Sequence, residues 1–396
     1  MVTTAASPRR ALVVGSAVTV ACALPVFLTS AMAVELADDL GFDAVGIGGA
    51  ISLFFGTMAL TSVYLGRLVD RLGATRSLRI AASGGGLASL GIALLARSWA
   101  TLAVGLVVAG LAAALGQPAA NRLLVNRIPV TRLGTAFGFK QSAPPVASML
   151  AGLSVPAIAL TLGWRWAFAL AAVGAVVAAI VVGARPAAPA SSRSGVVRGQ
   201  RAPLRDRPTL LVLAVGFGLG FTANSAVLAF YVEAAVRAGT SHQVAGLVFA
   251  AASLLAIVVR LIGGAASDRV AVNPLRLSAA LLASGAVGLG LLATGRPATM
   301  AVGAVVALAG TWGFPGLFWF ALVSAYPESP GRITGAMAPA AAGGMVGPAG
   351  FGAVAVNVSY TLAWGLAGLL ALLAAAGLVF GAHRLAAQAQ DTDVVG

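Results

Sequence analysis

The stretch "GRLVDRLGATR", residues 66–76, decides the fold, because four of its eleven residues are charged although it separates two long apolar runs. Part of it returns in "GAASDR", residues 264–269. The returning residues lie 198 positions downstream, half of the 396-residue chain: Gly66, Asp70 and Arg71 reappear as Gly264, Asp268 and Arg269. A charged turn at the same place in each half indicates an internal repeat.

The composition is that of a membrane protein. Hydrophobic residues make up 59% of the chain and charged residues 9%, whereas soluble domains hold about 45–50% apolar residues. The mean hydropathy is +0.97. Apolar runs of about 20 residues recur along the chain, and each is long enough to cross a hydrocarbon core about 30 Å thick. We therefore expect an all-α, polytopic membrane protein.

Hydropathy and turn residues predict twelve transmembrane helices in two six-helix halves. The halves cover residues 1–184 and 209–396, and a Pro-, Ser- and Arg-rich linker, residues 185–208, connects them. The expected spans are 11–35, 45–66, 77–97, 101–124, 134–161 and 164–184, then 209–233, 244–265, 275–295, 298–325, 332–357 and 360–383. Two further identities at the offset of 198 support the repeat: Glu35 with Glu233, and Trp166 with Trp364.

The arginines predict the orientation. With both termini in the cytoplasm, twenty arginines face that side and four face the other, namely Arg97, Arg165, Arg237 and Arg296. Cytoplasmic loops of membrane proteins carry such an excess of basic residues. The net charge of +14 is thereby explained without a nucleic-acid partner.

Several other classes of protein are disfavoured. The apolar stretch after Arg10 runs for about 24 residues, longer than the 7–15 residues of a signal-peptide core, so we read it as the first span. The chain has one cysteine, Cys22, and two histidines, which leaves no metal-ligand cluster. Its one lysine, Lys140, follows a phenylalanine, so no Gly-Lys phosphate-binding loop exists. We expect no cofactor, no metal and no enzymatic activity.

The pattern Gly66-x-Leu68-x-Asp70-Arg71-x-Gly73-x-x-Arg76 resembles the signature loop of the major facilitator superfamily. The resemblance extends over the whole chain, and it implies a secondary transporter that works by alternating access. It also implies a gating role for the loop and its degraded copy: Gly66, Asp70, Arg71, Gly73, Arg76, Gly264, Asp268 and Arg269. Asp70 would face span eleven and Asp268 span five. Gly66 lets a neighbouring helix approach closely. Spans three, six, nine and twelve are rich in Ala, Leu, Val and Gly, which suits contact with lipid.

Two departures from the family bear on mechanism. Many proton-coupled drug exporters carry an arginine in span four and a Gly-x-x-x-Gly-Pro element in span five. Here span four, residues 101–118, contains no arginine, and span five reads "GFKQSAPP", residues 138–145. Proton-coupled drug export is therefore the alternative, and a small polar or anionic solute is the favoured substrate.

Polar residues inside spans are costly and mark candidate substrate contacts. Lys140 lies about 9 Å inside the membrane at 1.5 Å per residue. The other candidates are Gln141, Gln117, Asn224, Trp312 and Trp319, and each of these can instead serve in interhelical bonding or packing. Arg260 lies nearer the membrane edge, where a long side chain can reach water, and we assign it a structural role.

The remaining expectations concern coupling and surroundings. Glu35 and Glu233 lie near the outer ends of their spans and are candidates for coupling to a proton. A receptor or scaffold that keeps the fold without transport is a remote alternative, because the chain ends in a short polar tail. We expect a monomer in the cell membrane whose partners are a small-molecule substrate, a coupling ion and the lipid bilayer.

Overall fold

A computed structural model describes residues 8–128, 133–183, 207–267, 273–325, 337, 340 and 342–395. Every regular element within these ranges is a helix. Among the described residues, eleven helical segments are long and apolar enough to cross a membrane. They correspond to eleven of the twelve predicted spans. The described part of the other, span eleven, is a helix of 15 residues.

The helices of the first half follow the predicted spans closely, except in the first and fifth. The first span ends early, and a short helix carrying Glu35 follows it. The fifth is divided into several pieces. In chain order the elements are α1 (Pro8–Ala31), α2 (Ala33–Leu40), α3 (Ala44–Leu72), α4 (Ala74–Leu95), α5 (Trp99–Arg127), α6 (Leu133–Gln141), α7 (Ala143–Ser154), the π-helix Val155–Ala159, α8 (Leu160–Leu162) and α9 (Trp164–Gly183).

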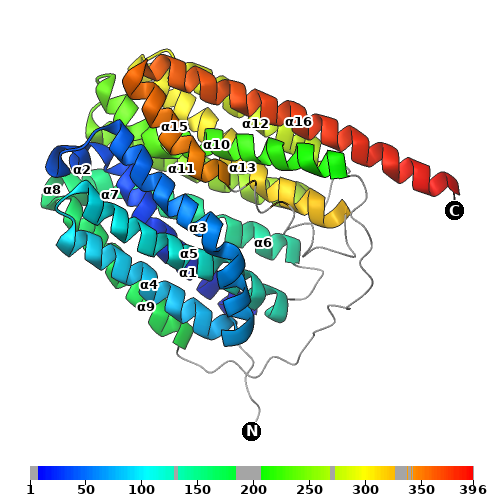
Figure 1. The fold of residues 1–396 in the computed structure, drawn as a ribbon, viewed down its shortest axis with the longest axis horizontal. Helices are drawn as coiled ribbons and strands as arrows, with labels where there is room; N and C mark the ends of the chain where they lie inside the picture. Colours follow the sequence, from blue (N-terminus) through cyan, green and yellow to red (C-terminus); the bar gives the residue numbers. More distant parts are fainter. Residues whose placement is uncertain are drawn as a thin grey trace, which may run out of the picture.

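The described residues of the second half form six helices. They are α10 (Arg207–Arg237), α11 (His242–Ser267), α12 (Pro274–Leu292), α13 (Pro297–Ala325), α15 (Gly343–Asn357) and α16 (Tyr360–Val395). Most of the predicted linker, residues 185–206, lies outside the described residues. In Figure 1 the helices of the first half lie below those of the second half, as two adjoining bundles.

Local chemistry sets several helix boundaries. The Asp43 carboxylate accepts a hydrogen bond from the Gly46 amide at 3.1 Å and caps α3. Ser98 and Thr101 form a reciprocal capping box at the start of α5. Gly73 separates α3 from α4 at φ +80°, a conformation that favours glycine. The positive φ therefore explains why glycine occupies this position of the charged turn.

The outer helices carry the exposed apolar surface. α4 packs against α9 in the first half, and α12 packs against α16 in the second. Their large apolar side chains are exposed, among them Leu87, Leu94, Val173, Leu369 and Leu373. This agrees with the expectation that spans three, six, nine and twelve contact lipid.

The two ends of the bundle carry different charges. The acidic end carries Glu35, Asp38, Asp39 and Asp43, and it lies near α2 at the left of Figure 1. The Arg-rich end carries the start of α1 and the turn between α3 and α4. α3 connects the two ends.

The halves meet along α3 with α15, α7 with α11 and α1 with α10. Glycines make the approach close toward the acidic end. A methyl group added at Gly152 of α7 would lie 2.6 Å from the Gly246 carbonyl oxygen of α11, and one added at Gly352 of α15 would lie 2.8 Å from the Ala44 carbonyl oxygen. Ser148 and Ser253 are hydrogen-bonded across the same interface at 2.9 Å. The backbones of the two halves are therefore in direct contact there.

Candidate functional site

A break in span five positions its polar residues. α6 ends at Gln141 and α7 begins at Ala143, with prolines in its first turn. Proline has no amide hydrogen to continue a helix but is tolerated at a helix start. The Ser142 hydroxyl donates to the Gly138 carbonyl at 3.1 Å, which also accepts from the Ser142 amide. Lys140 and Gln141 thus occupy the last turn of a helix that stops inside the protein.

Lys140 is buried, with 1% of its surface exposed. Its ammonium donates to the side-chain oxygen of Gln117 on α5, and it lies 3.4 Å from the side-chain oxygen of Gln141. Both acceptors are neutral. The structure therefore brings together three of the predicted substrate contacts around one buried charge.

Arg260 belongs to the same cluster, although it comes from the other half of the chain. Its Nε donates to the Trp312 carbonyl of α13 at 2.6 Å, and its Nη1 donates to the Gln141 carbonyl of α6. The guanidinium carbon lies 5.7 Å from the centre of the Trp312 ring. Only 7% of Arg260 is exposed. The expectation that this side chain reaches toward water at the membrane edge was wrong, because its hydrogen-bond acceptors lie inside the protein.

The charge of this cluster is not balanced by the described acidic residues. Four ion pairs occur among the described residues, and neither Lys140 nor Arg260 is in any of them. Their hydrogen-bond acceptors among the described residues are side-chain amide and main-chain oxygens. Two buried basic side chains thus lie together without a counter-charge among the described residues.

The two predicted tryptophans lie in different places. Trp312 contacts Phe27 of α1, with ring centres 5.5 Å apart, and so lies where α1, α11 and α13 meet. Trp319 packs against Phe217 and Phe318 within the second half. The two side chains therefore have different neighbours, although α13 continues through Pro315 between them. Trp312 alone joins the cluster.

Asn224 is fully buried in α10. Its side-chain oxygen accepts a hydrogen bond from the Thr311 hydroxyl of α13 at 3.0 Å. Its amide nitrogen has no partner among the described residues. Thr311 precedes Trp312, so Asn224 lies close to the cluster in the fold and retains a free donor.

Two glutamates lie at the acidic end, Glu233 buried and Glu35 partly buried. Glu35 pairs with His242 of α11 at 2.8 Å, and this contact joins the two halves. Glu233 accepts from Arg237 at 2.9 Å and from the Tyr360 hydroxyl at 2.8 Å. One oxygen of each carboxylate is buried without a partner among the described residues. The two proposed coupling residues therefore have similar surroundings.

The signature loop is paired within its own half. Arg122 of α5 donates to the Asp70 carboxylate at 2.6 Å and to the Val69 carbonyl at 3.1 Å. The Asp70 side chain is 75% exposed. Around Gly66 no atom lies within 4 Å of an added methyl group, so the close approach expected there does not occur in this structure.

The other loop residues divide into two groups. Arg71 and Arg76 are exposed at the Arg-rich end. Asp268 and Arg269 lie outside the described residues, and so does the side-chain environment of Gly264. The partners proposed for the second copy of the loop stay predictions.

Sequence reasoning missed several residues of these sites. Arg260 was given a structural role and was not counted among the substrate contacts. His242, Tyr360 and Arg122 were not singled out. A signal was present for Arg260 alone, since it is an arginine inside an apolar span. The others lie at helix starts or ends, where polar residues are ordinary.

Two comparisons with known proteins, one with family sequence models and one with solved structures, give matches. The sequence model of the Major Facilitator Superfamily matches residues 13–342. The fold resembles the crystal structure of a bacterial homologue of the human lysosomal transporter Spinster, in an inward-facing and occupied conformation, with a TM-score of 0.68. That match covers 96% of each chain at 14% identity, so it concerns the fold alone. No curated protein sequence matches this chain.

Proposed function

Since this chain belongs to the Major Facilitator Superfamily and is therefore a secondary transporter and not an enzyme, we propose that it carries a small organic anion by alternating access. The observation that carries the proposal is the pair of buried cations, Lys140 and Arg260. They come from different halves of the chain and meet at Gln141.

The chemistry of the pair favours an anion with more than one acceptor oxygen. A guanidinium donates in a fixed fork that fits carboxylate and phosphate, while an ammonium acts as a compact charge. An unpaired buried charge is costly, and an anionic substrate would offset the cost for both groups at once. Trp312 beside Arg260 adds an apolar wall, which suits a substrate with a carbon skeleton.

Because each half contributes one basic side chain to the site, the site suits a transporter whose halves rock about it. In transporters of this kind the substrate lies near the middle of the membrane at the interface of the repeats. Close backbone contacts at Gly152 and Gly352 support a state that is closed at the acidic end. On α3, Leu60 and Tyr64 lie toward the Arg-rich end and are 71% and 70% exposed. This supports a state that is open there.

The orientation belongs to the same proposal. The arginine distribution places the Arg-rich end and both termini in the cytoplasm of a cell whose membrane holds the protein. The state described would then face inward. The similar fold named above was also solved facing inward, which supports this reading for the present chain.

We assign coupling to the two glutamates at the acidic end. A carboxylate with one unpartnered buried oxygen can take up a proton and become neutral. Glu35 pairs with His242 across the halves, so a change of charge there would alter the contact that closes the acidic end. Glu233 is held within the second half by Arg237 and Tyr360, and its protonation would weaken that local network.

The experiment that tests the function is a ligand screen of the purified protein. The panel contains monocarboxylates, dicarboxylates and phosphate esters, with hydrophobic cations as the drug-like arm, and thermal stabilisation is measured. We expect anions to stabilise the wild type and to lose this effect in Lys140→Gln. Arg384→Gln, an exposed arginine on α16, is the matched control. Stabilisation by hydrophobic cations alone would favour drug export.

A further inference from the structure

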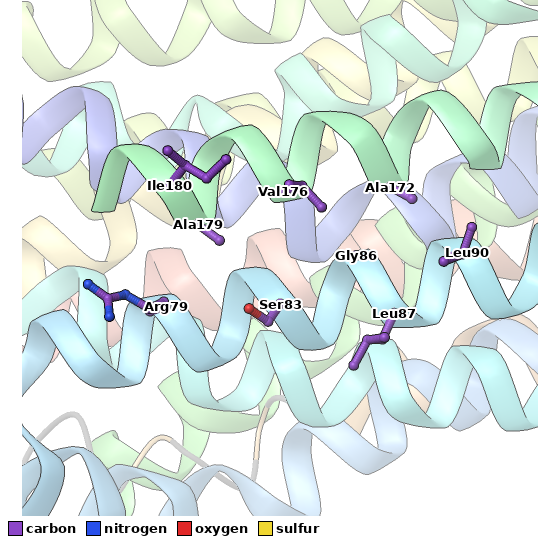
Figure 2. Close-up of a pocket in the computed structure, with 9 residues that line it drawn as sticks. All are labelled: Arg79, Ser83, Gly86, Leu87, Leu90, Ala172, Val176, Ala179 and Ile180. Carbon is purple, nitrogen blue, oxygen red and sulfur yellow. The ribbon is translucent and has the colours of Figure 1, made fainter. Parts of the chain in front are cut away.

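A groove of about 540 Å³ lies on the outer surface of the first half, between α4 and α9. Small residues form its floor, because Gly86 and Ala172 are buried where the two helices touch. A methyl group added at Gly86 would lie 3.2 Å from the side chain of Ala175. Leu87 and Ile180 stand beside the floor and are 67% and 64% exposed. Figure 2 shows these side chains along the two helices.

One end of the groove is basic. Arg79 is part of its lining, and Figure 2 shows Arg79 at the end opposite Leu90. No hydrogen bond or ion pair of Arg79 is found with the described residues. Arg76 lies one turn earlier on α4, on the same side of the helix. Arg10 donates to the Val181 carbonyl at 3.0 Å, next to Ile180, and brings a further guanidinium to this end.

Arg76 and Arg79 are not neutralised by the described residues of their own half. On its described helices the one acidic residue at the Arg-rich end is Asp70, and its carboxylate is paired with Arg122. The basic end of the groove therefore has a positive charge available for a ligand.

The length of the groove matches one leaflet of a bilayer. Arg79 and Leu90 are eleven residues apart, which corresponds to about 16 Å along a helix. Half of a hydrocarbon core of about 30 Å is about 15 Å. A groove that starts at a cation and ends near the midplane has the dimensions of one phospholipid chain below its headgroup.

We propose that this groove binds an anionic phospholipid, with one acyl chain between α4 and α9 and the phosphate on Arg79. Positive charge from Arg76 beside Arg79 favours a headgroup with a net negative charge over a zwitterionic one. Ser83 lies between Arg79 and Gly86 along the groove and contributes a hydroxyl near its basic end. The site lies on the lipid-facing surface and is separate from the Lys140 cluster.

The second half offers a matched control. Arg276 lies in the first turn of α12, and α12 is the counterpart of α4 in the repeat. Its Nη2 lies 3.5 Å from the ring nitrogen of His383 on α16. Arg276→Gln removes the same charge from the same end of the protein without touching the groove.

The test is lipid binding to the full chain, purified and delipidated in detergent. Phosphatidylglycerol and phosphatidylcholine with identical chains are compared by native mass spectrometry and by thermal stabilisation. We expect phosphatidylglycerol to bind more tightly, and Arg79→Gln to weaken it about fivefold. Ser83→Phe, which fills the groove, should reduce binding of both lipids, while Arg276→Gln should leave both unchanged.

Other outcomes overturn the proposal. Equal binding of the two lipids by the wild type would remove the anionic preference. Equal losses in Arg79→Gln and Arg276→Gln would show general attraction to a basic surface. If inorganic phosphate competes with the lipid and Ser83→Phe has no effect on lipid binding, the cations bind a free anion and the groove binds no acyl chain. Because bound lipid is counted directly, a change in stability of a variant does not obscure the result.

Discussion

Arg260 of α11 donates a hydrogen bond to the main-chain carbonyl of Gln141, the residue after Lys140. The bond joins the two halves of the chain at the point where span five is broken. It also places a second cation beside the first. The predictions below concern this cluster, the contacts that close the acidic end and the signature loop.

Removing the lysine charge should remove anion recognition. A hydrogen bond to a charged group contributes about 1.5–3 kcal/mol, so Lys140→Gln should weaken anion binding by about tenfold to 150-fold. Lys140→Arg should retain part of the affinity, because the charge remains. Titration of each folded variant with the anion found in the screen checks this. Unchanged affinity in Lys140→Gln would end the assignment and favour drug export.

Arg260 should tolerate lysine poorly. Its guanidinium donates to two carbonyls, those of Trp312 and Gln141, and an ammonium lacks this fork. Arg260→Lys should therefore cost about 1–3 kcal/mol of stability for a carbonyl left unsatisfied. Thermal unfolding of Arg260→Lys beside Arg384→Lys measures the difference. Equal melting temperatures would mean that the two carbonyl bonds contribute no stability.

Close backbone contact at the acidic end should be needed for transport. Gly152→Ala places a methyl group 2.6 Å from the Gly246 carbonyl oxygen, so it should open that end and slow transport. Gly91→Ala makes the same change in α4, where no atom lies within 4 Å, and should transport normally. A single cysteine introduced at the acidic end, in a Cys22→Ser background, is labelled from that side, and its labelling reports the opening. Similar labelling of the two variants would contradict the closed state.

The signature loop should affect conformation more than stability. The Asp70–Arg122 pair is largely exposed, and such pairs contribute about 0–1 kcal/mol. Asp70→Ala should change the melting temperature little, yet it should raise cysteine accessibility from the Arg-rich side when that side is closed. Asp268→Ala should do the same more weakly. If both variants label and transport as the wild type does, the loop is only a signal for membrane topology.

Glu233 and Glu35 should be needed to couple transport to a proton gradient. Glu233→Gln removes the charge but keeps a side chain that can bond Tyr360 and that cannot take up a proton. Uptake into proteoliposomes driven by a pH gradient should be lost in Glu233→Gln and in Glu35→Gln, while exchange of substrate at equal pH continues. Gradient-driven uptake that persists in both variants would remove these glutamates from coupling.

Sequence patterns predicted the helices well because membrane spans are set by length and apolarity, which are local properties. The depth of Lys140 was equally local, since it follows from counting along one helix. The presence of a second cation near Lys140 was not, because Arg260 lies 120 positions away. Its position depends on how two halves pack, and no spacing within one span reveals that.

Two pairs of tryptophans show the same limit. Trp312 and Trp319 share a face in an ideal helix, yet they are about 10 Å apart along the axis, and Pro315 lies between them. Trp166 and Trp364 occupy matching positions in the repeat, but Trp166 is 57% exposed and Trp364 only 1%. Identity at a repeat offset thus predicted the architecture and not the environment of each side chain.

The most direct test of the central claim is a double-mutant cycle of anion affinity by isothermal titration calorimetry. It compares the wild type, Lys140→Gln, Arg260→Gln and the double variant. If both cations hold one substrate, each single variant loses at least about tenfold, and the double variant loses less than the product of the two losses. Wild-type affinity in the double variant would contradict the claim.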